Sequence, residues 1–210
     1  HLRFHAIQFL HKLLALEPAR THEVIRAHPA AVGSVLTLLD DQREIVRAEA
    51  IQLVLQLARG APAGLLNLLA FQGAFDRLHS IVASELEAAA GDEGAAAAAE
   101  ATLRDALDMV GALLESNAPV RVLFCESALP ALLVGLLRLP PSHRKVEAER
   151  AALAAGALRR LLASESSPLA RDCLLRLGAL DVLMDLPTSP STATDGSLRA
   201  HALAALALLV

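Results

Sequence analysis

The sequence predicts an all-α protein built from stacked helical repeats. Two observations support this prediction: a dipeptide ending in arginine recurs along the chain, and each copy opens an Ala- and Leu-rich stretch of helical composition. Successive arginines are 44, 57, 46 and 49 residues apart, close to the roughly 40–47 residues of repeats made of two or three helices. The five dipeptides are Leu2-Arg3, Val46-Arg47, Leu103-Arg104, Glu149-Arg150 and Leu198-Arg199.

The register of the repeat extends beyond the arginines. Residues 2–10 align with residues 46–54, and an Ala, an Ile and a Gln are identical between the two stretches. A small-residue turn followed by a short apolar helix also recurs 23 to 28 residues after each of the first four arginines. We therefore expect a single domain over residues 1–210, a solenoid of about four to five units that is incomplete at both ends.

Prolines, glycines and carboxylates set the helices expected in the first part of the chain. Pro18 ends the first helix, because proline disfavours a helical conformation in the residue before it. The carboxylates of Asp40 and Asp41 can cap the helix that follows them, and Gly60-Ala61-Pro62 breaks that helix. The expected helices cover residues 2–16, 21–27, 31–39, 43–58, 63–70 and 73–84.

The same order of short, medium and long helices continues in the second half. After a long helix that ends near Glu115, residues 117–139 are expected to form a short and a medium helix, and residues 147–163 the next long helix. Residues 168–186 repeat the short and medium pair, and a fifth long helix follows Gly196. Three helices in each unit favour the armadillo repeat over the two-helix HEAT and tetratricopeptide patterns.

Two segments interrupt the repeat. Residues 85–100 contain Gly91-Asp92-Glu93-Gly94 and account for the one long interval, so we expect an insertion loop there. The alternative is that the alanines at 95–99 extend the following helix, since alanine propagates helices well. Residues 187–196 form a second expected loop, rich in Pro, Ser and Thr. Loops of a solenoid emerge on one edge, which makes both segments candidates for recognition or modification.

Composition constrains the core and the class of partner. Hydrophobic residues make up 54% of the chain but aromatics only 2%, so Leu, Ala and Val must fill a core of closely packed helices. Every run of about 18 residues carries polar or charged interruptions, so we expect no membrane-spanning helix. The net charge of −4 and the pI near 6.1 give no electrostatic basis for nucleic-acid binding.

The sequence carries no motif for chemistry. It has no Gly-x-Ser-x-Gly elbow, phosphate-binding loop, dinucleotide fingerprint or Cys-x-x-Cys pair. His1 and His5 have the spacing of helical metal ligands but lack the carboxylate of a zinc site. Cys125 and Cys173 lie in apolar helical patterns, so we expect buried thiols in a reducing compartment, without a disulfide or metal role. The prediction is a protein-binding module that is not an enzyme and has no catalytic residue, cofactor or metal.

The long helices line the concave surface of armadillo arrays, where importin-like members carry a Trp and, four residues later, an Asn that clamp an extended peptide. The equivalent pairs here are Gln8/Lys12, Gln52/Gln56, Met109/Leu113, Ala155/Arg159 and Ala204/Leu208. This ladder lacks the clamp, so we do not expect binding of nuclear signals. Neighbouring helices could bury the apolar members. The candidate protein-binding residues on this face are Gln8, Lys12, Gln52, Gln56 and Arg159.

One stretch of the second unit carries a family resemblance. Its parts are residues 49–53, residues 57–60 and the run Leu69-Ala70-Phe71-Gln72-Gly73-Ala74-Phe75-Asp76-Arg77-Leu78. They resemble the globular head of the general vesicular transport factor family, where an arginine-led helix and a turn precede an Ala-Phe-Glu-Asn-Ala-Phe-Glu-Arg-Leu-like run. Gln72-Gly73 stands here in place of Glu-Asn. The residues that carry the match are added to the candidate protein-binding set: Phe71, Phe75, Asp76 and Arg77.

The resemblance implies a function in membrane traffic. It implies a cytoplasmic protein, peripherally and indirectly attached to Golgi and transport-vesicle membranes, whose head binds a Rab GTPase, SNAREs and other tethers or golgins. It also implies a homodimer in the full-length protein and tethering in ER-to-Golgi and intra-Golgi transport. For Phe71 and Phe75 the alternative is a role in the core, since residues four apart share a helix face. Alternative functions are another armadillo scaffold, such as a cochaperone or cytoskeletal adaptor, and a regulatory subunit of an enzyme.

Overall fold

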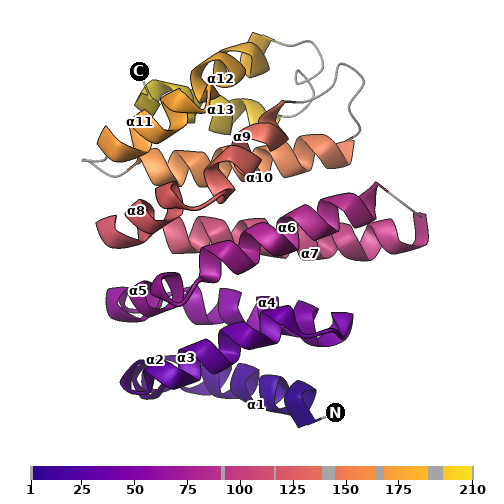
Figure 1. Ribbon diagram of the computed structural model, residues 1–210, viewed down its shortest axis with the longest axis vertical. Helices are drawn as coiled ribbons and strands as arrows, with labels where there is room; N and C mark the ends of the chain where they lie inside the picture. The colour runs from indigo at the N-terminus through magenta and orange to yellow at the C-terminus, as the bar shows by residue number, and fades with distance from the viewer. Residues whose placement is uncertain are drawn as a thin grey trace.

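The computed structural model describes residues 2–90, 93–115, 117–138, 145–163, 168–188 and 196–209. These residues form thirteen α-helices and one 3-10 helix, and none of them lies in a strand. Figure 1 shows the chain climbing through a stack of helices, with its two ends at opposite ends of the stack. The helices are α1 (Leu2–Leu16), α2 (Pro18–Ala27), α3 (Pro29–Leu36), η1 (Thr37–Asp40), α4 (Glu44–Ala58), α5 (Ala63–Phe71), α6 (Ala74–Ala89), α7 (Glu93–Leu114), α8 (Ala118–Glu126), α9 (Leu129–Leu137), α10 (Lys145–Leu162), α11 (Pro168–Arg176), α12 (Ala179–Thr188) and α13 (Gly196–Leu209).

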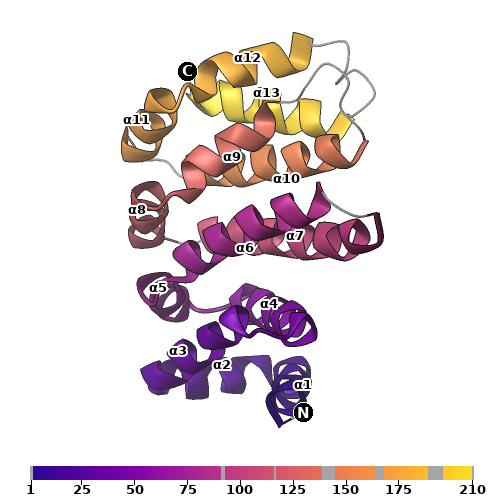
Figure 2. The same ribbon diagram turned by 45° about the vertical axis from the view of Figure 1, so that its right-hand side comes forward.

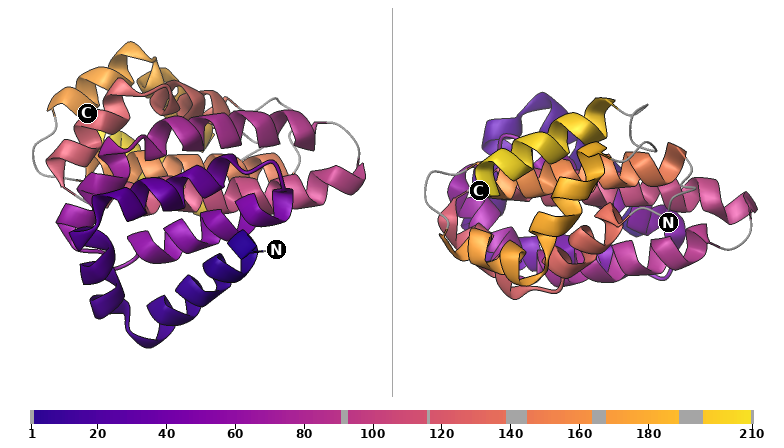
Figure 3. Two further views of the ribbon diagram at one scale, coloured as in Figure 1. Left: turned by 60° about the horizontal axis from the view of Figure 1, so that its bottom comes forward. Right: turned by 90° about the horizontal axis from the view of Figure 1, so that it is seen from above.

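The helices form three columns along the stack. The long helices α1, α4, α7, α10 and α13 pack in chain order, each against the next. The short helices α2, α5, α8 and α11 form a second column, and α5, α8 and α11 are visible along the left edge of Figure 2. The helices α3, α6, α9 and α12 form a third column that packs on the long helices. Helix α13 runs at an angle to the long helices beneath it when the stack is viewed from above (Figure 3). The predicted three-helix armadillo-like solenoid is confirmed.

Proline and glycine fix the joints between helices. Pro18 begins α2 as well as following the end of α1, because proline at the first helical position has no amide hydrogen to leave unpaired. Gly73 and Gly178 occupy the same joint in two units, directly before α6 and α12, with φ of 83° and 71°. A left-handed backbone favours glycine, which has no Cβ to clash. This requirement explains part of the recurring small-residue turn in the sequence.

The structure corrects the predicted insertion loop at residues 85–100. Helix α6 continues to Ala89 and α7 already begins at Glu93, so most of this segment is helical. The alternative of a helix extended through the alanines is the correct one, because alanine has the highest helix propensity. Of the predicted loop at 187–196, residues 187, 188 and 196 belong to helices, and residues 189–195 lie outside the described part of the chain.

Aliphatic side chains form one continuous core through the stack, as the composition predicts. Four consecutive small residues of α10, Ala154 to Ala157, are buried where this helix packs between α7 and α13. Small side chains allow the backbones of neighbouring helices to approach closely. The buried polar side chains among the described residues are Thr21, His22, Asp41 and Thr102.

Candidate protein-binding surface

Four of the five candidates on the long helices lie on the neighbouring pair α1 and α4. Gln8, Lys12 and Gln52 are exposed, and Gln56 is half-buried. His11 of α1 lies between the two helices, with its Nδ1 2.6 Å from the amide oxygen of Gln56 and its Nε2 3.3 Å from the carbonyl oxygen of Glu49. The structure therefore brings these four candidates together on two neighbouring helices that a polar contact joins.

The face follows a different register on the next long helix. Met109 and Leu113, predicted to be the equivalents of Gln52 and Gln56, are fully buried. Asp108 and Ala112, which are half-exposed, each lie one residue before a predicted position. One residue turns a helix position by about 100°, which is enough to exchange an outward position for an inward one. The alternative that neighbouring helices bury the apolar members is confirmed for Met109 and Leu113, and Asp108 takes an outward position of α7 instead.

The long helix α10 shows the same burial at one of its two positions. Ala155 is fully buried, and Arg159, the fifth candidate of this face, is only half-exposed. Three ion pairs connect α10 to α7 and the residue that follows α7. They are Arg104 to Glu149 at 3.2 Å, Arg160 to Glu115 at 2.8 Å, and Arg150 to Glu100. The exposed Arg104–Glu149 pair contributes little to stability, about 0–1 kcal/mol, whereas Arg150 and Glu100 are both half-buried. All three pairs occupy the charged groups of this part of the face with intramolecular partners.

Two carboxylates sit where the α4–α7 seam meets the outer face. Burial raises the pKa of Asp105, and the neighbouring carboxylate of Asp108 raises it further, while a hydrogen bond from Gln52 and the positive charges of Arg104 and Arg59 act in the opposite direction. Like charges held close together in a partly buried setting favour contact with a cationic or hydrogen-bond-donating group. Gln52 and these two residues extend the α1–α4 patch towards the middle of the stack.

The candidates from the family resemblance separate into two kinds. Phe71, the last residue of α5, is 65% exposed, whereas Phe75 is 3% exposed and belongs to the core. The ring of Phe75 packs edge-to-face on that of Phe124, with centroids 5.4 Å apart, and so joins α6 to α8. Phe75 is thus a core residue that no partner can reach, and its inclusion among the surface candidates was wrong. Phe71 and Phe75 lie on different helices, α5 and α6, so they do not share a helix face. The alternative of a core role is nevertheless confirmed for Phe75.

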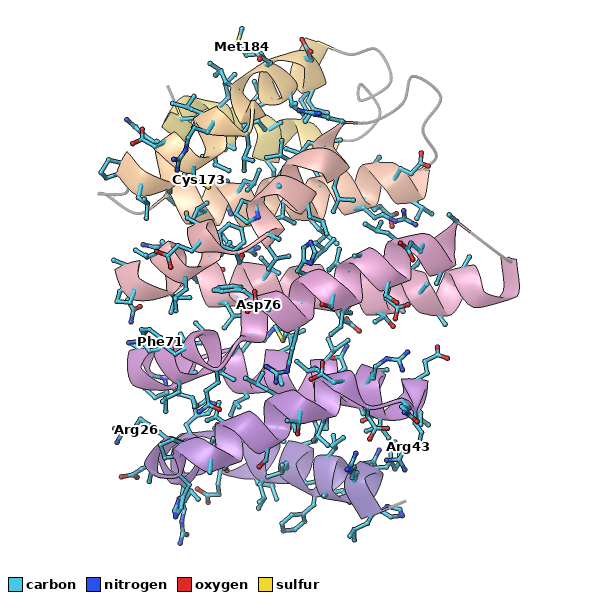
Figure 4. The ribbon with its side chains drawn as sticks, in the orientation of Figure 1. Arg26, Arg43, Phe71, Asp76, Cys173 and Met184 are labelled. Atoms are coloured by element: carbon cyan, nitrogen blue, oxygen red, sulfur yellow. The ribbon has the colours of Figure 1, made fainter. Side chains whose placement is uncertain are left out.

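Arg77 and Asp76 lie at the start of α6. The Nε of Arg77 donates a hydrogen bond to a carboxylate oxygen of Asp40 at 2.9 Å, and one Nη donates to the carbonyl oxygen of Gln72. Arg77 thereby connects its own joint to the preceding unit, which is a structural role. Asp76 is exposed, and Figure 4 places it near the joint that follows Phe71. Phe71 and Asp76 remain as surface candidates.

A buried carboxylate at Asp41 connects the first two long helices. Asp41 accepts hydrogen bonds from the guanidinium of Arg3 at 2.7 Å and from both the amide and the guanidinium of Arg43. These bonds, those from Arg43 above all, hold the pKa of Asp41 well below its usual range. The sequence predicts a helix cap here, but the helix N-cap is Arg43, and Asp41 instead organises the turn that precedes it. Arg3 and Asp41 meet because the repeat stacks α1 on α4.

Cys125 and Cys173 also meet across the stack, which the sequence analysis did not anticipate. They lie on α8 and α11, adjacent helices of the short-helix column, and the sulfur of Cys173 is 3.7 Å from the carbonyl oxygen of Cys125. Both are free thiols, one buried and one half-buried. Their separation in sequence is about one repeat, and this was the signal that could have predicted the contact.

Among the described residues, no three or more His, Cys, Asp or Glu side chains gather in a group that could hold a metal ion. No single described helix is long and apolar enough to cross a membrane, although the bent pair α8 and α9 meets the length and composition criteria together.

Comparison with curated proteins identifies relatives in vesicular transport. Over 146 residues, 70% of the chain, it is 30% identical to the intracellular protein transport protein USO1 of Saccharomyces cerevisiae. Over 85 residues, 40% of the chain, it is 31% identical to the human general vesicular transport factor p115. The chain spans only 8% and 9% of the lengths of these two proteins. No family model matches the chain.

Solved structures share the fold. Two crystal structures of Uso1 match the whole chain with TM-scores of 0.82 and 0.83, at 23% and 22% identity, and the match covers 32% and 30% of their chains. The armadillo repeats only protein of Plasmodium falciparum matches 99% of the chain and 80% of its own, with a TM-score of 0.65 and 17% identity. At these identities the likeness establishes the armadillo-like architecture.

Proposed function

Because the chain is homologous to the vesicular transport factors Uso1 and p115, we propose that it forms part of the head of a vesicle-tethering protein. The observation that carries this proposal is the 30% identity to yeast USO1 over 70% of the chain. The proposed role is non-enzymatic: the head binds proteins of the transport machinery and so helps to bring a vesicle to its target membrane in ER-to-Golgi and intra-Golgi transport.

The proposed partners are those of the family that the sequence resembles. They are a Rab GTPase, SNAREs and other Golgi tethers or golgins, and the full-length protein is proposed to be a homodimer. Attachment to Golgi and vesicle membranes would then be peripheral and indirect, from the cytoplasm. A stacked-repeat architecture supports such a role, because a solenoid presents extended surfaces whose residues come from several units.

We place the first contact surface on the long helices. It comprises Gln8 and Lys12 of α1, Gln52 and Gln56 of α4, and the acidic pair of α7. Three of the four α1–α4 residues are exposed, and α1 and α4 pack side by side. Amide and charged side chains with a lysine at one end and carboxylates at the other favour a folded, polar partner over an apolar peptide. Arg159 lies beyond the ion-paired seam and is proposed only as a peripheral contact.

A second contact surface is proposed at the joint between α5 and α6. Phe71 exposes most of its ring there, and exposed aromatic side chains are enriched at the energetic centres of protein interfaces. Asp76 adds a negative charge beside it, in the first turn of α6. Figure 4 shows Phe71 on the short-helix edge of the molecule, where a partner could reach it without touching the long helices.

Pull-down with purified Golgi Rab GTPases and SNAREs tests the function and assigns the surfaces. The bait variants are Lys12→Glu with Gln52→Lys for the first surface and Phe71→Ser for the second. Glu87→Lys, at an exposed position of α6, is the matched control. The proposal predicts enrichment by the wild type and the control, and loss in one of the two surface variants. Recovery no greater than with an unrelated armadillo domain would contradict the proposed function.

A further inference from the structure

The two cysteines of the chain form a pair that bridges consecutive repeats. Cys125 lies on α8 of the third complete unit and Cys173 on α11 of the fourth, and these two helices pack against each other. The thiol of Cys173 points at the backbone of Cys125, and its sulfur lies 3.7 Å from the carbonyl oxygen of that residue. Figure 4 marks Cys173 on α11, next to α8.

The surroundings keep the sulfur of Cys125 in the thiol form. Burial raises the pKa of Cys125 to about 12, and the neighbouring thiol of Cys173 and the carboxylate of Glu126 add to this effect, opposed by Arg176. Cys125 is half-buried whereas Cys173 is 7% exposed, so a small molecule reaches Cys125 first.

We propose that Cys125 and Cys173 are a dithiol modification site, which small-molecule disulfides such as oxidised glutathione convert to a disulfide across the two repeats. In the first step the Cys125 thiol loses its proton, and the thiolate attacks the oxidant, forming a protein–glutathione disulfide and releasing one glutathione thiolate. In the second step the Cys173 thiolate attacks the Cys125 sulfur and releases the second glutathione. The protein loses two electrons and two protons, and the oxidant is reduced to two thiols.

The environment makes this reaction slow at neutral pH. Only the thiolate attacks a disulfide, and at pH values well below the pKa the thiolate fraction rises about tenfold for each pH unit. The pair therefore stays reduced in a reducing compartment and responds to sustained oxidation. Once formed, the disulfide ties α8 to α11 and constrains how the last two units move against each other, because a cross-link removes the freedom of the chain between its ends.

Peptide mapping after oxidation of the full chain provides the test. The chain is incubated with oxidised glutathione at mildly alkaline pH, the remaining thiols are alkylated, and the protein is cleaved with trypsin without reduction. Cleavage at the arginines isolates Cys125 in residues 122–138 and Cys173 in residues 172–176. We expect these two peptides to be linked to each other, without glutathione, and the linkage to form about tenfold faster for each added pH unit.

A serine variant separates the two steps of the reaction. Cys173→Ser should accumulate a glutathione adduct on Cys125 that is not resolved, and its helical circular dichroism confirms that it is folded. Oxidised wild type should also unfold at a higher temperature than the reduced protein. Glutathione on both cysteines of one molecule, disulfide-linked dimers, or two thiols that stay free while the denatured chain is oxidised would each overturn the proposal.

Discussion

Replacing Leu78 by alanine tests how tightly α6 packs into the stack. Leu78 is 0% exposed and belongs to the continuous core. The substitution removes three carbon atoms from an apolar environment, which costs about 2–3 kcal/mol. The cavity left behind adds roughly 24 cal/mol for each Å³ that neighbouring side chains fail to fill. We therefore expect the free energy of unfolding to fall by about 3–4 kcal/mol.

Urea unfolding followed by helical circular dichroism measures this change, with the midpoint shift converted at a common denaturant slope. Leu16→Ala is the matched control, since the same atoms are removed from a leucine that is 78% exposed on α1. The control should stay within about 0.5 kcal/mol of the wild type. The packing argument would be refuted if Leu78→Ala lay in that narrow range too, or if both variants lost equal stability.

Three further predictions concern the Asp41 cluster, the glycine joints and the small residues of α10. Arg43 depresses the pKa of Asp41, so Asp41 stabilises the fold above its unfolded pKa of ~3.9 and this contribution is lost as the pH falls below it. The stability difference between wild type and Asp41→Asn in urea titrations should accordingly shrink on acidification; a constant difference from neutral pH to pH ~2 would contradict this. Gly73→Ala should lower the thermal midpoint, at a cost of about 1 kcal/mol for a side chain at φ 83°, whereas Gly135→Ala, in open space on α9, should raise it by a similar amount. A rise in both variants would remove the argument for a glycine joint. Ala154→Leu should destabilise the chain by about 1–3 kcal/mol in the same assay, because Ala154 is fully buried and a larger side chain overpacks such a site, and an unchanged midpoint would show that α10 is packed more loosely.

The sequence predicts the repeat architecture because the evidence for it is local. A spaced arginine, a proline or glycine at each joint and a run of leucines and alanines each act within a few residues, and their recurrence shows that one unit is repeated. Helix ends were predicted to within a few residues over most of the chain. The main error, a loop at 85–100, arose because two glycines and an acidic pair resemble a turn, while the alanines beside them favour a helix more strongly.

The candidate surface was predicted less completely, because it depends on how units are rotated against each other. The repeat alignment was one residue out of register on α7, where Met109 points inward and Asp108 outward. Phe71 and Phe75 are four residues apart, yet a joint between them sends one ring to the surface and the other to the core. Such differences follow from the joint geometry and the stacking, which a single sequence does not specify.

The contacts between units could be predicted from the sequence in part. Asp41 with Arg3, and Cys173 with Cys125, are separated by about one repeat in the sequence. In a solenoid, residues one repeat apart are neighbours in space. Comparing residues about one repeat apart in the sequence would have predicted both pairs. The sequence does not show that Asp41 is buried while the guanidinium groups around it remain partly exposed.

Titration calorimetry of the purified chain with a GTP-loaded Golgi Rab GTPase is the most direct test of the proposed tethering role. We predict saturable binding that is weakened at least about tenfold, or ~1.4 kcal/mol, with the GDP-loaded GTPase or with one of the two surface variants (Lys12→Glu with Gln52→Lys, or Phe71→Ser), and is unchanged in Glu87→Lys. Heats that match those of an unrelated armadillo domain, or equal binding by all variants and both nucleotide states, would contradict it.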